Sequence, residues 1–197
     1  MQVYDACSRA FHEAISKNDS EALDVLLPAL HNIIALGTGA IVSHAANTFF
    51  YSVYNNQSAF PVLAGETLEE WLAYSENLLR YIALQDIDSQ NANALSNLAT
   101  LLSDRGDYKS ALKCIEDALE ILANRDDTKT VSLAWQPGYK ANLSIELELY
   151  ISKASIFMEQ DKSDKARELA EKVIQIAKEH NYDSGEVLAA KYILENI

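Results

Sequence analysis

Glycine, proline and cysteine are scarce in this sequence. Among 197 residues there are six glycines, three prolines and two cysteines, while 49% of the residues are apolar. So few loop-forming residues, with alanine and leucine dominant in the remainder, favour an all-helical protein with almost no strand. Cys7 and Cys114 each lie in an amphipathic helical pattern, so we expect two free, buried thiols and no disulfide.

Basic residues are also in short supply. The chain has 16 Lys and Arg against 29 Asp and Glu, a net charge of −13, and its basic residues do not cluster. Phosphate backbones and anionic membrane surfaces are bound by clustered Lys and Arg, so nucleic acid and membrane are not the predicted partners. The first residues lack a basic segment followed by an apolar one, so we expect no secretory signal and a cytoplasmic location.

Charge is absent altogether from the 41 residues between Val25 and Gly65. A membrane span is excluded because polar residues interrupt the window before ~18 apolar residues accumulate. A dinucleotide site at Gly37-Thr-Gly39 would need a third small residue where Val42 stands, and an acidic residue ~20 positions further on. Both are missing, so we interpret this segment as a tight link between two helices.

A helical hairpin is clearest around Arg105-Gly106-Asp107. Apolar residues recur at helical spacing on both sides of it, with Leu95, Leu98, Ala99 and Leu102 before and Tyr108, Ala111, Leu112, Ile115, Ala118, Leu119 and Leu122 after. Gly106 can take the left-handed conformation that ends a helix, and Asp107 can accept N–H bonds at the start of the next. The pattern predicts two antiparallel helices.

These residues resemble a tetratricopeptide repeat, a 34-residue helix-turn-helix unit. The resemblance covers residues 92–125, and it is weaker over 150–181. Its matched positions are Asn97, Leu98, Ala99, Leu102, Gly106, Asp107, Tyr108, Ala111, Ile115 and Ala118, with Leu95 in the place usually held by Trp. The resemblance implies a right-handed superhelical array of antiparallel helix hairpins. Ala166 lies 55 residues after Ala111, and a loop from Asn124 accounts for most of the excess over 34.

The whole chain, residues 1–197, is predicted to form one such domain. We expect hairpins over about 2–36, 38–84, 88–124 and 138–180, and a C-terminal capping helix over 183–196. Ser20 is the expected cap of the second helix, and Pro28 should kink or divide that helix. Thr67-Leu68-Glu69-Glu70 reads as a capping box.

The helix predicted from residue 40 to residue 54 has two distinct faces. Val42, Ala46, Phe49, Phe50 and Val53 form a stripe for burial, and the opposite stripe is polar and aromatic. The resemblance implies that the first helix of each hairpin lines a concave ligand groove. The predicted groove residues are His44, Asn47, Tyr51, Tyr54, Asn93, Ser96, Asn97, Thr100, Asp104, Glu148, Ser152, Ser155 and Glu159. The alternative is that an interior hairpin is covered on both sides and has no room for charges.

Catalytic and cofactor signatures are missing. The four histidines, His12, His31, His44 and His180, belong to no recognisable motif with Ser, Cys or Asp, and no Walker-type or Cys-x-x-Cys motif occurs. The sequence therefore predicts no enzyme, no cofactor and no metal. A carboxylate clamp of the kind that holds chaperone tails is not predicted either, because Glu148 and Ser152 stand near the positions that require basic residues.

Three functional hypotheses follow. The first is a noncatalytic scaffold that binds a neutral or basic peptide or protein segment on its concave face. The second is an acidic immunity or inhibitor-type protein that binds a basic toxin or enzyme through outward residues such as Glu168 and Glu171. The third is an enzyme on a helical scaffold, which a pocket with several shifted titratable groups would support. The sequence leaves the oligomeric state open.

Overall fold

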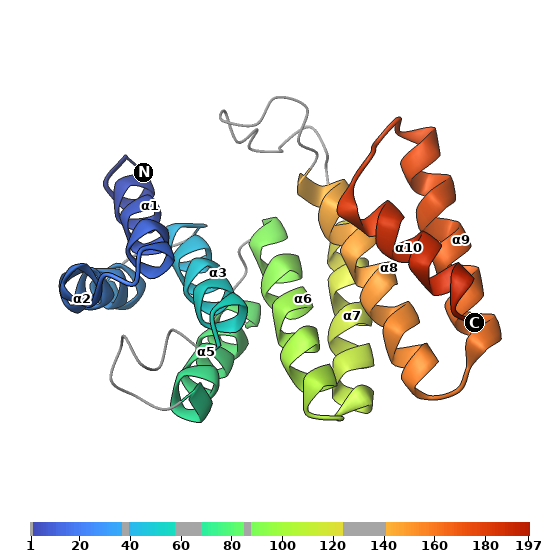
Figure 1. Ribbon diagram of the computed structural model, residues 1–197, viewed down its shortest axis with the longest axis horizontal. Helices are drawn as coiled ribbons and strands as arrows, with labels where there is room; N and C mark the ends of the chain where they lie inside the picture. Colours follow the sequence, from blue (N-terminus) through green and yellow to red (C-terminus); the bar gives the residue numbers. More distant parts are fainter. Residues whose placement is uncertain (1, 37–39, 58–67, 85–87, 124–140) are drawn as a thin grey trace. The chain divides into compact units, whose positions relative to one another are not determined.

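All regular structure in the described part of the chain is helical. The computed structural model describes residues 2–36, 40–57, 68–84, 88–123 and 141–197, and in these ranges it contains only helices (Figure 1). They are α1 (Gln2–Ser16), α2 (Ser20–Leu36), α3 (Ala40–Asn55), α5 (Leu68–Ala83), α6 (Asp88–Asp104), α7 (Tyr108–Ala123), α8 (Ala141–Glu159), α9 (Ser163–Glu179) and α10 (Gly185–Glu195). The all-α prediction is confirmed.

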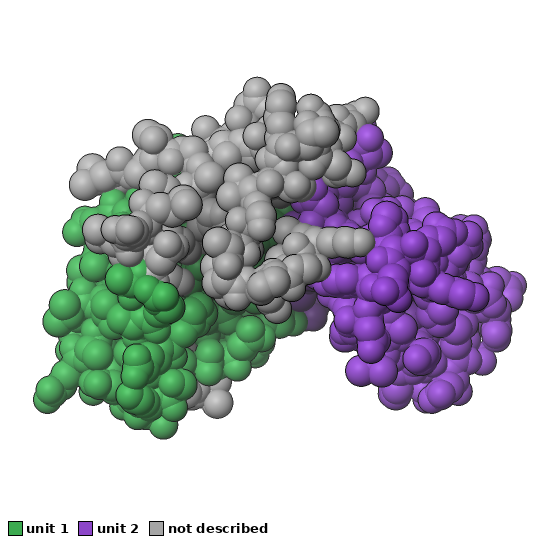
Figure 2. All heavy atoms as spheres, turned by 90° about the horizontal axis from the view of Figure 1, so that it is seen from above, with its two compact units in different colours: residues 1–97 green, residues 98–197 purple. Residues whose placement is uncertain are grey.

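The helices group into two compact units, residues 1–97 and 98–197 (Figure 2). In the first unit α1 packs against α2 and α3, α2 packs against α3, and α3 packs against α5. In the second unit α8 packs against α7 and α9, and α10 packs against both α8 and α9. The boundary between the units falls inside α6. A single domain over residues 1–197 stays a prediction.

The turn between α6 and α7 has the predicted geometry. Gly106 has φ +78°, its N–H donates to Ser103 O at 2.9 Å, and the Asp107 N–H donates to Leu102 O at 2.9 Å. These two bonds satisfy carbonyls that the end of a helix leaves open. The Ser110 N–H donates to Asp107 Oδ1 at 3.1 Å, so Asp107 caps α7 as expected.

The same turn recurs at three other helix ends. Asn18, Asp161 and Asn181 have φ of 55°, 56° and 49°. At each, the following N–H reaches back five residues, with N···O distances of 2.9 Å (Asp19 to Ala14), 2.8 Å (Lys162 to Phe157) and 2.8 Å (Tyr182 to Ala177). Asn and Asp tolerate the left-handed region better than other residues with side chains. A glycine is therefore not needed to stop these helices.

One detail of α2 differs from prediction. Its cap is Asp19 and not Ser20, because the Ala22 N–H donates to Asp19 Oδ1 at 3.0 Å and Ser20 is already helical. The helix continues through Pro28 from Ser20 to Leu36, so the proline does not divide it, and a kink at Pro28 stays a prediction. Pro28 lacks an N–H, and a helix tolerates one missing bond when packing against neighbours holds it together.

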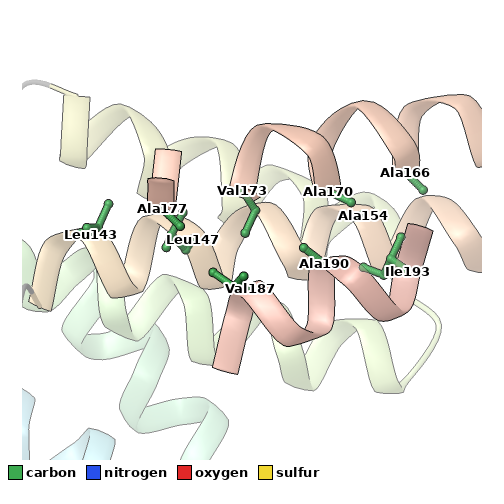
Figure 3. Close-up of a cluster of buried hydrophobic side chains, with 10 residues drawn as sticks. All are labelled: Leu143, Leu147, Ala154, Ala166, Ala170, Val173, Ala177, Val187, Ala190 and Ile193. Carbon is green, nitrogen blue, oxygen red and sulfur yellow. The ribbon is translucent and has the colours of Figure 1, made fainter. Parts of the chain in front are cut away.

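The core of the second unit is made of small and branched apolar side chains. Figure 3 shows ten of its residues, which come from α8, α9 and α10: Leu143, Leu147, Ala154, Ala166, Ala170, Val173, Ala177, Val187, Ala190 and Ile193. Ala154, Ala166, Ala170 and Ala190 are fully buried, and such small side chains allow helix backbones to approach closely. Leu147 is also fully buried, and it contributes a larger apolar side chain to the same core.

Both cysteines are free, as expected, but Cys7 and Cys114 are half-buried rather than buried. Burial raises the pKa of the Cys7 thiol above its usual value, which disfavours the reactive thiolate.

The left-handed turn can be tested by substitution at Gly106. Gly106→Ala should lower the free energy of unfolding by ~1 kcal/mol, because φ is +78° and only the backbone conformation opposes a side chain there. Gly106→Asn should lower the free energy of unfolding by only a few tenths of a kcal/mol, since Asn18 and Asn181 already adopt this conformation. Urea unfolding followed by circular dichroism measures both.

Gly185 provides the matched control, because its φ is not positive and it also has no atom within 4 Å of an added Cβ. Gly185→Ala should be neutral or slightly stabilising, since Ala is the better helix former. Equal losses at Gly106 and Gly185 would contradict the role of the turn.

Candidate functional site

The buried stripe of α3 is as predicted. Val42 is 4% exposed, Phe49 0%, Phe50 1% and Val53 0%. Ala46 is also fully buried, so the stripe forms one continuous apolar face. In the described ranges no helix is long and apolar enough to span a bilayer.

The opposite stripe of α3 is partly covered. Tyr51 and Tyr54 are half-buried, and their rings contact Phe50, with centroid separations of 5.6 Å and 5.2 Å. The buried Phe50 ring therefore holds one side of each tyrosine ring in place, and the rest of each ring is exposed to solvent. The side chain of His44 lies outside the described residues.

Asn47 on α3 and Asn97 on α6 form a buried amide pair. Asn97 Nδ2 donates to Asn47 Oδ1 at 2.6 Å, and the two residues are 1% and 4% exposed, respectively. Ser96, which precedes Asn97 in the sequence, is fully buried as well. The prediction that these three residues line an open groove is therefore wrong for their position, because a ligand cannot reach side chains with so little exposed surface.

The other predicted groove residues keep some exposed surface. Four of them are half-buried, namely Asn93, Thr100, Glu148 and Ser152. Three are exposed, namely Asp104, Ser155 and Glu159. Their role in binding stays a prediction. The structure thus divides the predicted set into a buried amide pair with Ser96 and a group that solvent reaches.

The turns give a common register for α6 and α8. Gly106 and Asp161 hold the same left-handed position at the end of these helices. Counting back from each turn, Asp104 corresponds to Glu159, and Thr100 corresponds to Ser155. Both first helices therefore carry an exposed carboxylate at the residue before the turn begins, preceded by a hydroxyl one helical turn earlier.

Charge differs strongly between α8 and α9. Helix α8 contains three acidic residues and one basic residue, whereas α9 contains four of each. The only base of α8, Lys153, is directed at α7, where its Nζ lies 3.1 Å from Glu116 Oε1. On α9, Lys172 donates to the Tyr150 hydroxyl at 2.8 Å and lies over that ring at 4.0 Å. The excess of negative charge is thus on the first helix of this hairpin.

One Ser–His contact, which sequence analysis did not find, resembles part of a nucleophilic site. Ser52 Oγ lies 3.3 Å from His12 Nδ1. The Ser52 hydroxyl also donates to Thr48 O at 2.8 Å, so its proton is directed at a backbone carbonyl and not at the His12 ring. A catalytic base must instead accept the hydroxyl proton, and Ser52 is only 1% exposed. This pair is arranged for packing between α1 and α3. In the described residues no group of three or more His, Cys, Asp or Glu could hold a metal ion.

His31 belongs to an aromatic cluster in the first unit. Its ring centroid lies 5.0 Å from Tyr74, 5.7 Å from Phe49 and 6.3 Å from Trp71. Burial lowers the pKa of His31, and its Nε2 has no hydrogen-bond partner in the described part of the chain. The cluster joins α2, α3 and α5 and holds a neutral imidazole.

Comparison with known families identifies the repeats. Tetratricopeptide-repeat models match residues 91–123 and residues 147–180. The two matches correspond to α6 with α7 and to the larger part of α8 with α9, as the sequence predicted. No curated protein and no solved structure matches the chain. Tetratricopeptide repeats suggest a protein-interaction scaffold.

The amide pair can be tested with a double-mutant cycle. Asn47→Ala and Asn97→Ala should each lower the free energy of unfolding by ~1–3 kcal/mol, since each leaves a buried amide without its partner. The double variant should lose less than the sum of the two. Asn55→Ala, at an exposed position of α3, is the control and should change stability little. Additive losses would show that the two amides do not interact.

The neutral state of His31 predicts loss of stability in acid. Its pKa is lowered on folding, so the unfolded chain takes up a proton first as the pH falls through ~6.5. Stability should therefore decrease below that pH, and His31→Phe should reduce the decrease. The difference between the melting temperatures at pH 7.5 and pH 5.5 measures this decrease. His180→Gln, at an exposed position, is the control. An unchanged pH dependence in His31→Phe would contradict this role.

Proposed function

We propose that this tetratricopeptide-repeat-like protein is a noncatalytic scaffold that holds a neutral or basic segment of another protein against the first helices of its two matched repeats, α6 and α8. The observation that carries the proposal is the repeated exposed carboxylate, Asp104 on α6 and Glu159 on α8, at equivalent positions of the two matched repeats. A ligand that follows one helix to the next meets the same chemistry twice.

The chemistry of this surface favours an extended segment with Lys or Arg. Ser155 and Thr100 offer hydroxyls that bond to a peptide backbone, and the carboxylate a turn further on attracts a positive side chain. In the first unit, Tyr51 and Tyr54 carry partly exposed rings that by themselves suit apolar or cationic groups. Asn47, Ser96 and Asn97 are not part of the proposed contact surface, because they are buried.

A second candidate function is an acidic immunity or inhibitor-type protein that binds a basic toxin or enzyme through its outer surface. It draws on the net charge of −13. Glu168 and Glu171 are exposed on α9, as this candidate requires, but α9 as a whole carries as many basic as acidic residues. The charge distribution therefore favours the first candidate. A cytoplasmic location stays a prediction for both.

Peptide selection can separate the two candidates. We expect a random peptide library displayed on phage and selected on the full chain to yield peptides enriched in Lys and Arg. The double reversal Asp104→Lys with Glu159→Lys should weaken a selected peptide about tenfold, since each exposed pair contributes up to ~1 kcal/mol. Fluorescence anisotropy at two salt concentrations measures the affinity, which should fall with added salt.

Glu168→Lys with Glu171→Lys is the matched control, with the same change of charge on exposed residues of α9. It should leave the affinity within about twofold, because long-range effects of exposed charges are screened by salt. If this control loses binding and the first pair does not, the outer-surface candidate is correct. Selection of acidic peptides would contradict both.

A further inference from the structure

Helix α3 is the hub of the first unit, and it carries no charged side chain. It packs against α1, α2 and α5, the other described helices that lie wholly within this unit. None of its 16 residues is Asp, Glu, Lys or Arg. A positive charge that arises in the packing around α3 therefore meets no carboxylate of that helix, and an uncompensated charge at a buried position opposes packing.

His31 of α2 brings a titratable group into the packing around α3. Its ring centroid lies 5.7 Å from Phe49 of α3, and 5.0 Å and 6.3 Å from Tyr74 and Trp71 of α5. Its Nε2 atom is buried and has no hydrogen-bond partner among the described residues. An imidazolium has an N–H on both ring nitrogens, so protonation places a charged donor at this position with no acceptor.

The carboxylates on the same sides of the neighbouring helices are exposed. Asp24 precedes His31 by two turns of α2, and Glu70 precedes Tyr74 by one turn of α5. The remaining charged residues of α5 lie on its opposite side, and the described ones of α1 are exposed, namely Arg9, Glu13 and Lys17. Exposed charges are hydrated and screened by salt, so they stabilise a buried imidazolium only weakly.

The second unit has no comparable histidine. His180 is the only histidine in residues 98–197, and it is exposed at the end of α9. The buried residues of the core formed by α8, α9 and α10 are all apolar. Protonation of a histidine between pH 7.5 and 5.5 therefore acts on the packing of the first unit and leaves this core unchanged.

We propose that the first unit is an acid-sensitive element of the chain, in which protonation of His31 opens the packing of α2 and α5 on α3 while the second unit stays folded. Opening uncovers the rings of Phe49 and Trp71, which are 0% and 7% exposed in the closed unit. Compact units of one chain can open separately. The chain thus presents an additional apolar surface in mild acid and conceals it at neutral pH.

The direction of the effect follows from linkage. Burial lowers the pKa of His31, so the opened unit takes up the proton first as the pH falls through 6.5. The ratio of open to closed first unit therefore rises below that pH. One unit below the pKa of a free histidine, a single histidine raises this ratio by at most about tenfold.

Hydrogen exchange of the full chain, read by mass spectrometry at pH 7.5 and 5.5, tests where the opening occurs. After correction for the intrinsic pH dependence of exchange, amides of α2, α3 and α5 should lose up to about tenfold in protection at pH 5.5. Amides of α8, α9 and α10 should stay within about twofold. Equal loss in both units overturns the proposal, as does unchanged or greater protection of the first unit in acid.

Two variants assign the effect to a residue. His31→Phe should keep the protection of the first unit in acid. His12→Gln is the matched control, because His12 also contacts α3, with its Nδ1 3.3 Å from Ser52 Oγ, but is itself exposed. It should leave the acid loss in place. A loss that persists in His31→Phe, or that only His12→Gln removes, overturns the role of His31. Circular dichroism at pH 7.5 confirms folding, and His31→Leu replaces His31→Phe if the larger ring does not fit.

Discussion

The left-handed residue at the end of a helix is the constraint from which the repeats follow. At residues 18, 106, 161 and 181 one residue with positive φ lets the chain reverse, while two backbone bonds close the preceding helix. After residues 18, 106 and 161 the next helix begins two residues later, so the turn also fixes which positions of the two helices face each other. Asn, Gly and Asp all meet the requirement, so the turn is retained where the glycine is lost.

The fixed register explains why some hairpins resemble the family and others do not. Counted from Asn18 and Gly106, Leu23 and Leu30 stand where Ala111 and Ala118 stand in α7, and all four are buried. In the partner helices the sizes also differ, since Phe11 and Ala14 correspond to Ala99 and Leu102. The two hairpins therefore share the turn and the buried positions while the residue sizes at these positions differ, and the sequence signature is lost.

For the same reason the fold was more predictable than the site. Helical periodicity and turn chemistry locate α6, α7 and α9 because they depend on residues close in sequence. The burial of Asn47 depends on Asn97, fifty residues away, and nothing local distinguishes an amide that meets solvent from one that meets another amide. The exposure of Leu188 and Tyr192 on α10 escaped prediction in the same way, since exposure is decided by which neighbours are present.

The buried amide pair also limits what the first helices can recognise. In an array where amide side chains face the ligand, their donors and acceptors bond to a peptide backbone and hold it without regard to sequence. Here Asn47 and Asn97 use their amides on each other, so the polar groups left at the surface are mainly hydroxyls and carboxylates. Carboxylates attract cations over several ångströms and impose little directional order. The proposed recognition, if built on them, would select for the charge of a segment more than for its conformation, and it would tighten as salt is removed.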